Sequence, residues 1–146
     1  MVRLVKLTPF FFRNCGEDPE LLSKEGRPCV LLLRLRYRGR RLSFAVPLRS
    51  NLTSSTPESL YFPLPPNPRT RSGNRHGLHF EKMFPVNGEC YQAFRFKSND
   101  YLASLVKYID RRYDAIVARA QGYLDDYIEK GPFRYSEMAR KLDARN

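Results

Sequence analysis

The sequence predicts an α+β fold, with strands in its first two thirds and a long helix near its C-terminus. Two patterns carry this prediction. Apolar residues alternate with polar ones over residues 30–47, and apolar residues recur at steps of three and four over residues 99–129. The chain has 146 residues, of which 42% are hydrophobic, so we expect a single domain over residues 1–146 with one moderate core.

The clearest predicted element is a β-hairpin within residues 30–47. A two-residue turn at Gly39-Arg40 would place Tyr37 opposite Leu42 and build one apolar face. This register sets Arg36 opposite Ser43 and Arg34 opposite Ala45, which leaves space for a ligand at the arginine tips.

The remaining elements follow in order along the chain. Residues 2–7 alternate as a strand, Thr8 is placed to cap a short helix, and residues 17–26 suggest a further helical turn. Residues 77–86 predict a strand or a strand pair. The periodic segment at 99–129 predicts one long helix, or two that break near Gly122, with a cap at Ser98 or Asn99 and an end at Gly131-Pro132.

The segment between these elements is unusual. Residues 51–76 hold five prolines and one glycine, and a loop of this length in a compact domain is usually functional or disordered. We interpret Tyr61 and Phe62 as core residues ahead of the alternative, that they stack on bases. The three cysteines show no metal spacing and are interpreted as reduced thiols: Cys15, Cys29 and Cys90.

Charge is distributed unevenly. The net charge is +11, and residues 1–97 hold 17 lysines and arginines against 7 acids. Between residues 27 and 75 all ten basic residues are arginine, whose guanidinium matches phosphate oxygens well. This predicts a polyanionic partner, most commonly nucleic acid. No apolar run is long enough for a spanning helix and no signal peptide is evident, so we expect a cytoplasmic protein that does not bind a membrane.

The sequence lacks the residue patterns that several types of enzyme chemistry require. There is no glycine-rich phosphate loop, no cluster at metal spacing, and no carboxylate pair beside the arginines for two divalent ions. We therefore expect no metal and no cofactor, and any nuclease activity should act on RNA, whose 2′-OH supplies the nucleophile. The groups suited to such chemistry are Arg49, Ser50 and the only two histidines, His76 and His79.

The motifs "FAVPLRSN" and "GLHFEKMFPV", with the hairpin and the C-terminal helix, resemble the toxins of type III toxin–antitoxin systems. These are ToxN-like endoribonucleases, and the chain looks closest to their CptN and TenpN branches. The resemblance implies a compact, strongly bent antiparallel sheet or barrel, related to MazF and Kid toxins and flanked by helices. It implies metal-independent cleavage of cellular or phage mRNA that leaves 2′,3′-cyclic phosphate ends. It also implies inhibition by a pseudoknot RNA antitoxin, which the toxin excises and with which it forms a closed hetero-oligomer, without binding DNA.

Within this resemblance, Ser50 matches the functional serine of the family. Arg49 stands where ToxN has threonine and no lysine follows, so Arg49, His76 or His79 is expected to take the role of that lysine. The residues expected to bind RNA are Lys6, Arg34, Arg36, Arg38, Asn51, Arg69, Arg71, Arg75 and Lys82. Two alternatives remain open at this point: a non-catalytic RNA-binding module, and a MazF-like toxin inhibited by a protein.

Overall fold

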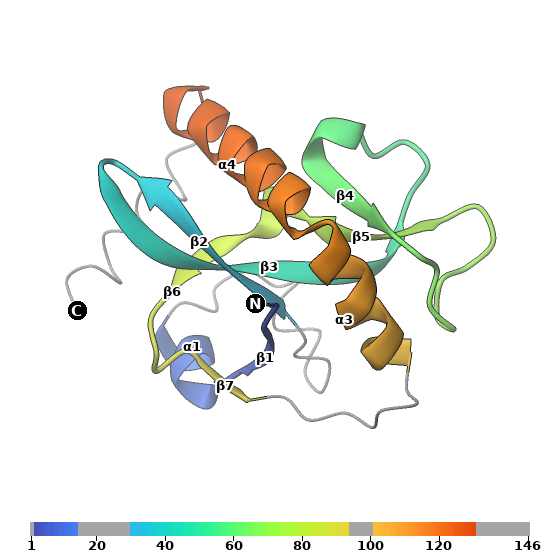
Figure 1. Ribbon diagram of the computed structural model, residues 1–146, viewed down its shortest axis with the longest axis horizontal. Coiled ribbons are helices and arrows are strands. Elements are labelled where there is room, and N and C mark those ends of the chain that lie inside the picture. Colours follow the sequence, from blue (N-terminus) through green and yellow to red (C-terminus); the bar gives the residue numbers. More distant parts are fainter. Residues whose placement is uncertain (1, 15–29, 94–100, 131–146) are drawn as a thin grey trace.

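The computed structural model describes residues 2–14, 30–93 and 101–130 (Figure 1). Several expectations fall outside these residues: the helical turn at 17–26, the cap at Ser98 or Asn99, and the helix end at Gly131-Pro132. Cys15 and Cys29 also lie outside them. Cys90 is described, and it is a buried thiol rather than half of a disulfide.

Seven antiparallel strands of the described residues form one open sheet, so the predicted α+β class is confirmed, whereas these residues form no closed barrel. The sheet order is β4-β5-β3-β2-β1-β7, and β6 also pairs with β3. The strands are β1 (Leu4–Leu7), β2 (Val30–Tyr37), β3 (Arg40–Leu52), β4 (Tyr61–Leu64), β5 (Arg75–His79), β6 (Phe84–Val86) and β7 (Tyr91–Ala93).

The hairpin of β2 and β3 forms as predicted, but its register differs by two residues. Its turn is Arg38-Gly39, and Leu35 pairs with Leu42 instead of Phe44. Both turn residues have positive φ, 50° for Arg38 and 80° for Gly39, which a type I′ turn requires. A shift of two keeps every side chain on its predicted face. The cross-strand partners do change: Arg34 is opposite Ser43, and Arg36 is opposite Arg41.

Strand β3 lies in the middle of the sheet and pairs with other strands along both of its edges. It continues to Leu52, beyond the predicted end at Pro47, and its second edge pairs with β6 near Phe44 and with β5 near Arg49. A single turn of 3-10 helix, η2 (Phe80–Lys82), separates β5 from β6 and so interrupts the partner strand once. Residues 77–86 are therefore part of a strand pair, which was one of the two predicted forms.

The proline-rich segment at 51–76, interpreted from the sequence as one long loop, contains regular structure. It contains a 3-10 turn, η1 (Glu58–Leu60), and the edge strand β4. An edge position explains why the strand tolerates Pro63, which needs no donor on its outer side. Tyr61 and Phe62 are buried, as predicted, so this segment contributes to the core.

Two described helices follow the sheet, which was one of the two predicted forms. They are α3 (Tyr101–Arg111) and α4 (Tyr113–Lys130), and the break falls at Arg112 instead of near Gly122. Five residues of the predicted apolar stripe belong to the main core and are almost completely buried: Leu105, Ile109, Ile116, Ala120 and Leu124. Figure 1 shows α4 crossing above β2 and β3. None of the described helices is long and apolar enough to cross a membrane.

A second, smaller core contains residues of β1 and β6 with the short helix α1 (Pro9–Asn14). The Thr8 hydroxyl accepts a hydrogen bond from the Phe11 amide at 3.5 Å, so the predicted cap is confirmed. The Phe11 ring stacks on Phe84 with the ring centres 4.7 Å apart. The sheet is thus covered by apolar groups from both sides.

Candidate functional site

Arg49, Ser50 and Asn51 lie inside β3, not in a turn after a strand. The pairing of β3 with β5 is regular up to Arg49, opposite Gly77, and resumes at Leu52, opposite Arg75. The register shift between these pairs is a β-bulge or a similar irregularity, a feature that often re-aims side chains beside active sites. We call this region of β3 the bulge end.

The hydroxyl of Ser50 is held by the loop that follows β4. Asn67 Nδ2 donates to Ser50 Oγ at 2.8 Å, while Asn67 Oδ1 accepts from the Arg69 amide at 2.7 Å and from the Thr70 hydroxyl at 3.2 Å. Ser50 is partly exposed. The loop therefore fixes the hydroxyl of a residue that is itself partly exposed.

Asn51 organises the same loop rather than presenting its amide to a ligand. Its Nδ2 donates to the Arg69 carbonyl at 3.0 Å, and its Oδ1 accepts from the Arg71 amide at 2.7 Å and from Asn74 Nδ2 at 3.2 Å. These bonds leave the side chains of Arg69 and Arg71 exposed at the surface. Asn51 thus holds the loop that carries two of the predicted RNA-binding arginines.

The two histidines point to opposite faces of β5. They are three residues apart on one strand, and side chains alternate between the faces of a sheet. His76 faces α3, where its ring lies 5.9 Å from the ring of Tyr101. His79 faces the other side, so the two histidines cannot both act on one bound phosphate.

His76 is buried and hydrogen-bonded within the protein. Its Nδ1 donates to the Pro65 carbonyl at 2.8 Å and lies 3.1 Å from the Tyr101 hydroxyl, which also donates to that carbonyl. Burial lowers the pKa of His76, although the bond to Pro65 raises it in part. Burial also raises the pKa of Tyr101 to about 12. These bonds give His76 a structural role in fixing α3 to the sheet.

His79 shares its face of the sheet with Arg49. Arg49 pairs with Gly77, and His79 lies two residues along β5 from Gly77, which makes Arg49 and His79 diagonal neighbours. Such neighbours are about 7–8 Å apart at the backbone, within the reach of a long side chain. The Tyr61 ring covers Gly77 on the same face: a Cβ on Gly77 would lie 2.9 Å from Tyr61 Cδ2.

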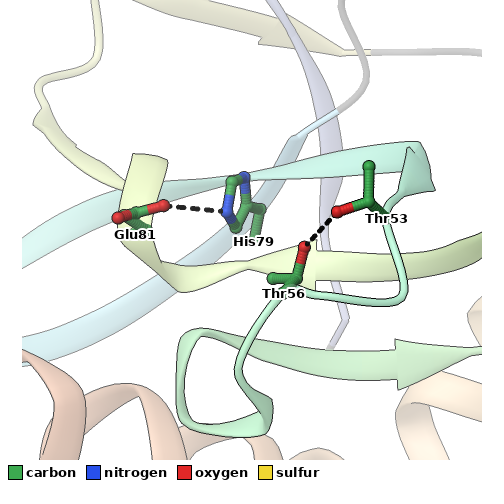
Figure 2. Close-up of polar contacts among 4 residues, drawn as sticks. All are labelled: Thr53, Thr56, His79 and Glu81. Atoms are coloured by element: carbon green, nitrogen blue, oxygen red, sulfur yellow. Dashed lines mark hydrogen bonds and ion pairs between the residues drawn. The ribbon is translucent and has the colours of Figure 1, made fainter.

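A carboxylate that the sequence prediction did not select completes this face. His79 Nε2 lies 3.4 Å from Glu81 Oε1, and Figure 2 shows the two side chains pointing toward one another from β5 and η2. The side chain of Glu81 is 48% exposed and that of His79 only 8%. Glu81 is therefore the member of the pair that is open to solvent. The spacing His-x-Glu across the end of a strand was the signal available in the sequence.

Arg75 lies on the same face, because it is separated from His79 by an even number of residues. Its Nη1 donates to the Tyr61 hydroxyl at 2.5 Å, and this bond raises the pKa of Arg75 further. Arg75 is exposed, so its guanidinium keeps other donors for a ligand. The face thus combines an imidazole–carboxylate pair with two arginines: Arg49, Arg75, His79 and Glu81.

The predicted hairpin arginines lie at the other end of β3, which we call the hairpin end. Arg34 and Arg36 are exposed on β2, and Arg34 Nη1 is 3.4 Å from the Ser43 hydroxyl. Arg38 is in the turn, where its guanidinium lies 5.4 Å from the centre of the Tyr37 ring. The sequence prediction missed Arg41, which the observed register places opposite Arg36.

The two predicted lysines lie on other elements than the predicted arginines, and Lys82 directly follows Glu81. Lys6 is exposed on β1, opposite Gln92 of β7, and Lys82 is half-buried in η2. Among the residues that the structure describes, no group of three or more His, Cys, Asp or Glu side chains is arranged to hold a metal ion.

Comparisons with protein-family models, curated proteins and solved structures find no match to this chain.

Proposed function

We propose that the protein is a metal-independent endoribonuclease whose active site is the face at the bulge end formed by Arg49, Arg75, His79 and Glu81. One observation carries this proposal. Arg49 and His79 share one face of the sheet, and His79 contacts an exposed carboxylate at 3.4 Å. A phosphate bound by the arginines would therefore lie beside a pair of groups that can accept and return a proton.

The proposed reaction is a transesterification of the RNA backbone. The 2′-OH attacks the neighbouring phosphorus atom, the bond to the 5′-oxygen breaks, and a 2′,3′-cyclic phosphate forms. The pair of Glu81 and His79 accepts the proton of the 2′-OH and returns one proton to the departing 5′-oxygen, so no net proton is consumed. Arg49 and Arg75 neutralise the extra charge on the phosphate oxygens in the transition state.

Ser50 is the residue that resembles the functional serine of the ToxN-like toxins. Its hydroxyl already accepts from Asn67 Nδ2, and its own hydrogen can be donated to a phosphate oxygen. With this resemblance, we propose a bacterial toxin of a type III system with a related fold, which is inhibited by a repeated pseudoknot RNA. In this proposal the exposed arginines at both ends of β3 bind the RNA backbone.

A second candidate is a non-catalytic RNA-binding module. The observation that favours it is the bonding of the bulge end, where Asn51 and Arg75 are engaged within the protein. Such a module would require the arginines but neither Ser50 nor Glu81. The two candidates therefore differ in the response of one variant, Glu81→Gln.

The test is cleavage of a labelled RNA by the purified protein in excess chelator, with analysis of the product ends. We expect cleavage with 2′,3′-cyclic phosphate and 5′-hydroxyl ends. Glu81→Gln keeps the size of the side chain and should lower the rate by about 10²-fold, a typical contribution of general-base catalysis. Glu129→Gln, an exposed glutamate on α4, is the matched control and should cleave at the wild-type rate.

Three results would contradict the proposal. Cleavage that stops with chelator and returns with magnesium would indicate metal chemistry. An unchanged rate in Glu81→Gln would remove the carboxylate from the mechanism. RNA binding without any cleavage would support the non-catalytic module instead.

A further inference from the structure

A charged groove lies between the β2–β3 hairpin and α4, at the hairpin end. Its volume is about 560 Å³, within the range of about 300–1,000 Å³ that is common for small-ligand sites. Arg34, Arg36 and Arg41 line it from the sheet, and Asp114 and Asp125 line it from α4, together with the ring of Tyr113. The groove thus has one cationic and one anionic wall.

The wall on α4 is held to the strand by one side chain. Gln121 Nε2 donates to the Arg36 carbonyl at 2.9 Å, and Gln121 Oε1 accepts from the Arg36 amide at 2.8 Å. Gln121 Nε2 also donates to Asp125 Oδ1 at 2.9 Å. Because Gln121 satisfies the backbone at the edge of β2, the separation of the two walls is fixed, and one oxygen of Asp125 is left for other donors.

The arginine wall forms no ion pair within the part of the chain that the structure describes, although two aspartates line the opposite wall. Arg36 and Arg41 stand directly opposite each other on adjacent strands, and neither guanidinium has an ion pair among the described residues. Like charges in directly opposite positions destabilise a sheet. A bound phosphate would remove this repulsion, since each guanidinium can donate two parallel hydrogen bonds to its oxygens.

The aspartates restrict what else can enter. They would repel a second phosphate, so the groove suits a ligand with one anionic end and one end that donates hydrogen bonds. A single nucleotide has this form. Guanine presents N1–H and N2–H donors on one edge and fits a carboxylate with two hydrogen bonds, whereas uracil presents one donor on that edge. Tyr113 offers an aromatic ring on which a base can stack.

We propose that this groove is a nucleotide-reading subsite, which binds one phosphate of an RNA at Arg36 and Arg41 and the donor edge of a guanine at Asp114 and Asp125. The subsite is separate from the proposed active-site face, because Arg41 and Arg49 are eight residues apart on β3, and eight residues of an extended strand span about 26 Å. The inference rests on the proposed function only in taking RNA as the ligand. In this proposal the protein recognises guanine when the RNA binds, and not in the cleavage step.

The test measures binding of short RNAs with a 2′-O-methyl group at every position, so that cleavage cannot occur. Two oligonucleotides that differ by one guanine or uracil are compared on wild type, Asp114→Asn, Asp125→Asn and Asp126→Asn. Asp126 is exposed and adjacent to Asp125 but does not line the groove, so it is the matched control.

The sign of the effect separates the proposal from a plain basic surface. Loss of a carboxylate that binds guanine should lower affinity for the guanine oligonucleotide by about 5- to 150-fold, the range for a good bidentate contact, and leave the uracil oligonucleotide nearly unchanged. On a plain basic surface, removal of any negative charge raises RNA affinity. Increased affinity in Asp114→Asn and Asp125→Asn, equal to that in Asp126→Asn, would overturn the proposal, as would equal losses for both oligonucleotides.

Failure of this inference can be distinguished from failure of the proposed function. The binding experiment uses uncleavable RNA and does not depend on Glu81 or Ser50. A guanine preference without cleavage would leave the subsite standing and reject the nuclease. Cleavage without a guanine preference would do the reverse. Arg36→Gln with Arg41→Gln should weaken binding of both oligonucleotides by similar factors, because phosphate contacts carry no base information.

Discussion

The two ends of β3 differ in how firmly their polar side chains are held by neighbouring residues. At the hairpin end, Arg36 and Arg41 are exposed, face each other and have no ion pair among the described residues. At the bulge end, the polar side chains are fixed: Ser50 by Asn67, Arg75 by Tyr61, and His79 by Glu81. Figure 1 shows how far apart these ends lie, since β3 crosses the molecule between them.

This difference indicates a division of roles. Binding of a phosphate tolerates mobile side chains, because the attraction of a guanidinium extends over several ångströms. Chemistry requires the reacting groups within about 0.5 Å of their productive positions, which hydrogen bonds to neighbouring residues provide. In the function proposed above, the hairpin end would therefore serve RNA binding alone, and the bulge end would hold the phosphate that reacts. The predictions below test this assignment, starting from the largest expected effect.

Ser50→Ala tests the bulge end. If the hydroxyl donates to the phosphate in the transition state, the variant should cleave RNA about 10²- to 10³-fold more slowly, with unchanged affinity for uncleavable RNA. Asn67→Ala removes the partner but keeps the hydroxyl, and it should have a much smaller effect. Cleavage rates in excess chelator give the comparison. Equal rates in Ser50→Ala and wild type would reduce Ser50 to an anchor of the loop.

Gly77→Ala tests how tightly the side chains pack on the face of the sheet that holds Arg49 and His79. The new methyl group would lie 2.9 Å from Tyr61 Cδ2, 3.0 Å from Leu52 Cδ1 and 3.0 Å from the Phe62 carbonyl oxygen. Overpacking of this kind should lower the free energy of unfolding by about 1–3 kcal/mol. At the loop after β6, Gly88→Ala meets nothing within 4 Å and is the control. Urea denaturation of both variants measures the difference, and equal stabilities would show that Tyr61 moves aside easily.

Replacement of Arg34 and Arg36 by glutamine tests the hairpin end. Each phosphate contact on single-stranded RNA contributes about −0.7 to the slope of log affinity against log salt concentration, so the double variant should lose up to about 1.4. Its cleavage rate at saturating RNA should equal that of wild type. A salt titration with uncleavable RNA measures the slope. Parallel slopes would place the RNA along Arg69, Arg71 and Arg75 instead.

His76 should give the smallest effect, on the opposite face of the bulge end. Burial lowers its pKa in the folded chain, whereas in the unfolded chain it stays near the usual value of about 6.5. Below that pH the unfolded chain binds a proton that the folded chain resists, so stability is complete above about pH 6.5 and decreases as the pH falls. His76→Gln should lack this part of the decrease. Unfolding free energies measured across this range provide the test.

Much of the fold could be predicted from the sequence. The period-2 pattern on β2 and β3 identified both strands and the faces of their side chains, and the later 3.6-residue pattern identified the stripe from Leu105 to Leu124 that packs on the sheet. These properties depend on neighbours along the chain, and burial of apolar groups enforces them locally. The burial of Tyr61 and Phe62 followed from the same preference of aromatic groups for the core.

The register of the hairpin could not be obtained in this way. A period-2 pattern looks the same after a shift of two residues, so hydrophobicity could not distinguish Leu35–Leu42 from Leu35–Phe44. The turn decided it, because Arg38-Gly39 adopts two positive φ values, with Gly39 in the second position. This shift brought Arg41 opposite Arg36 and thus created the cationic wall of the groove.

For the candidate site, too, the sequence determined some features and the tertiary structure decided the others. The sequence by itself determined that His76 and His79 face opposite ways if they share a strand, since their separation is odd. Only the tertiary structure decided that His76 is bonded under α3, that β3 shifts register beside Ser50, and that η2 brings Glu81 to His79. These contacts join segments whose separate patterns carry no information about one another, and packing of the whole chain is what selects them.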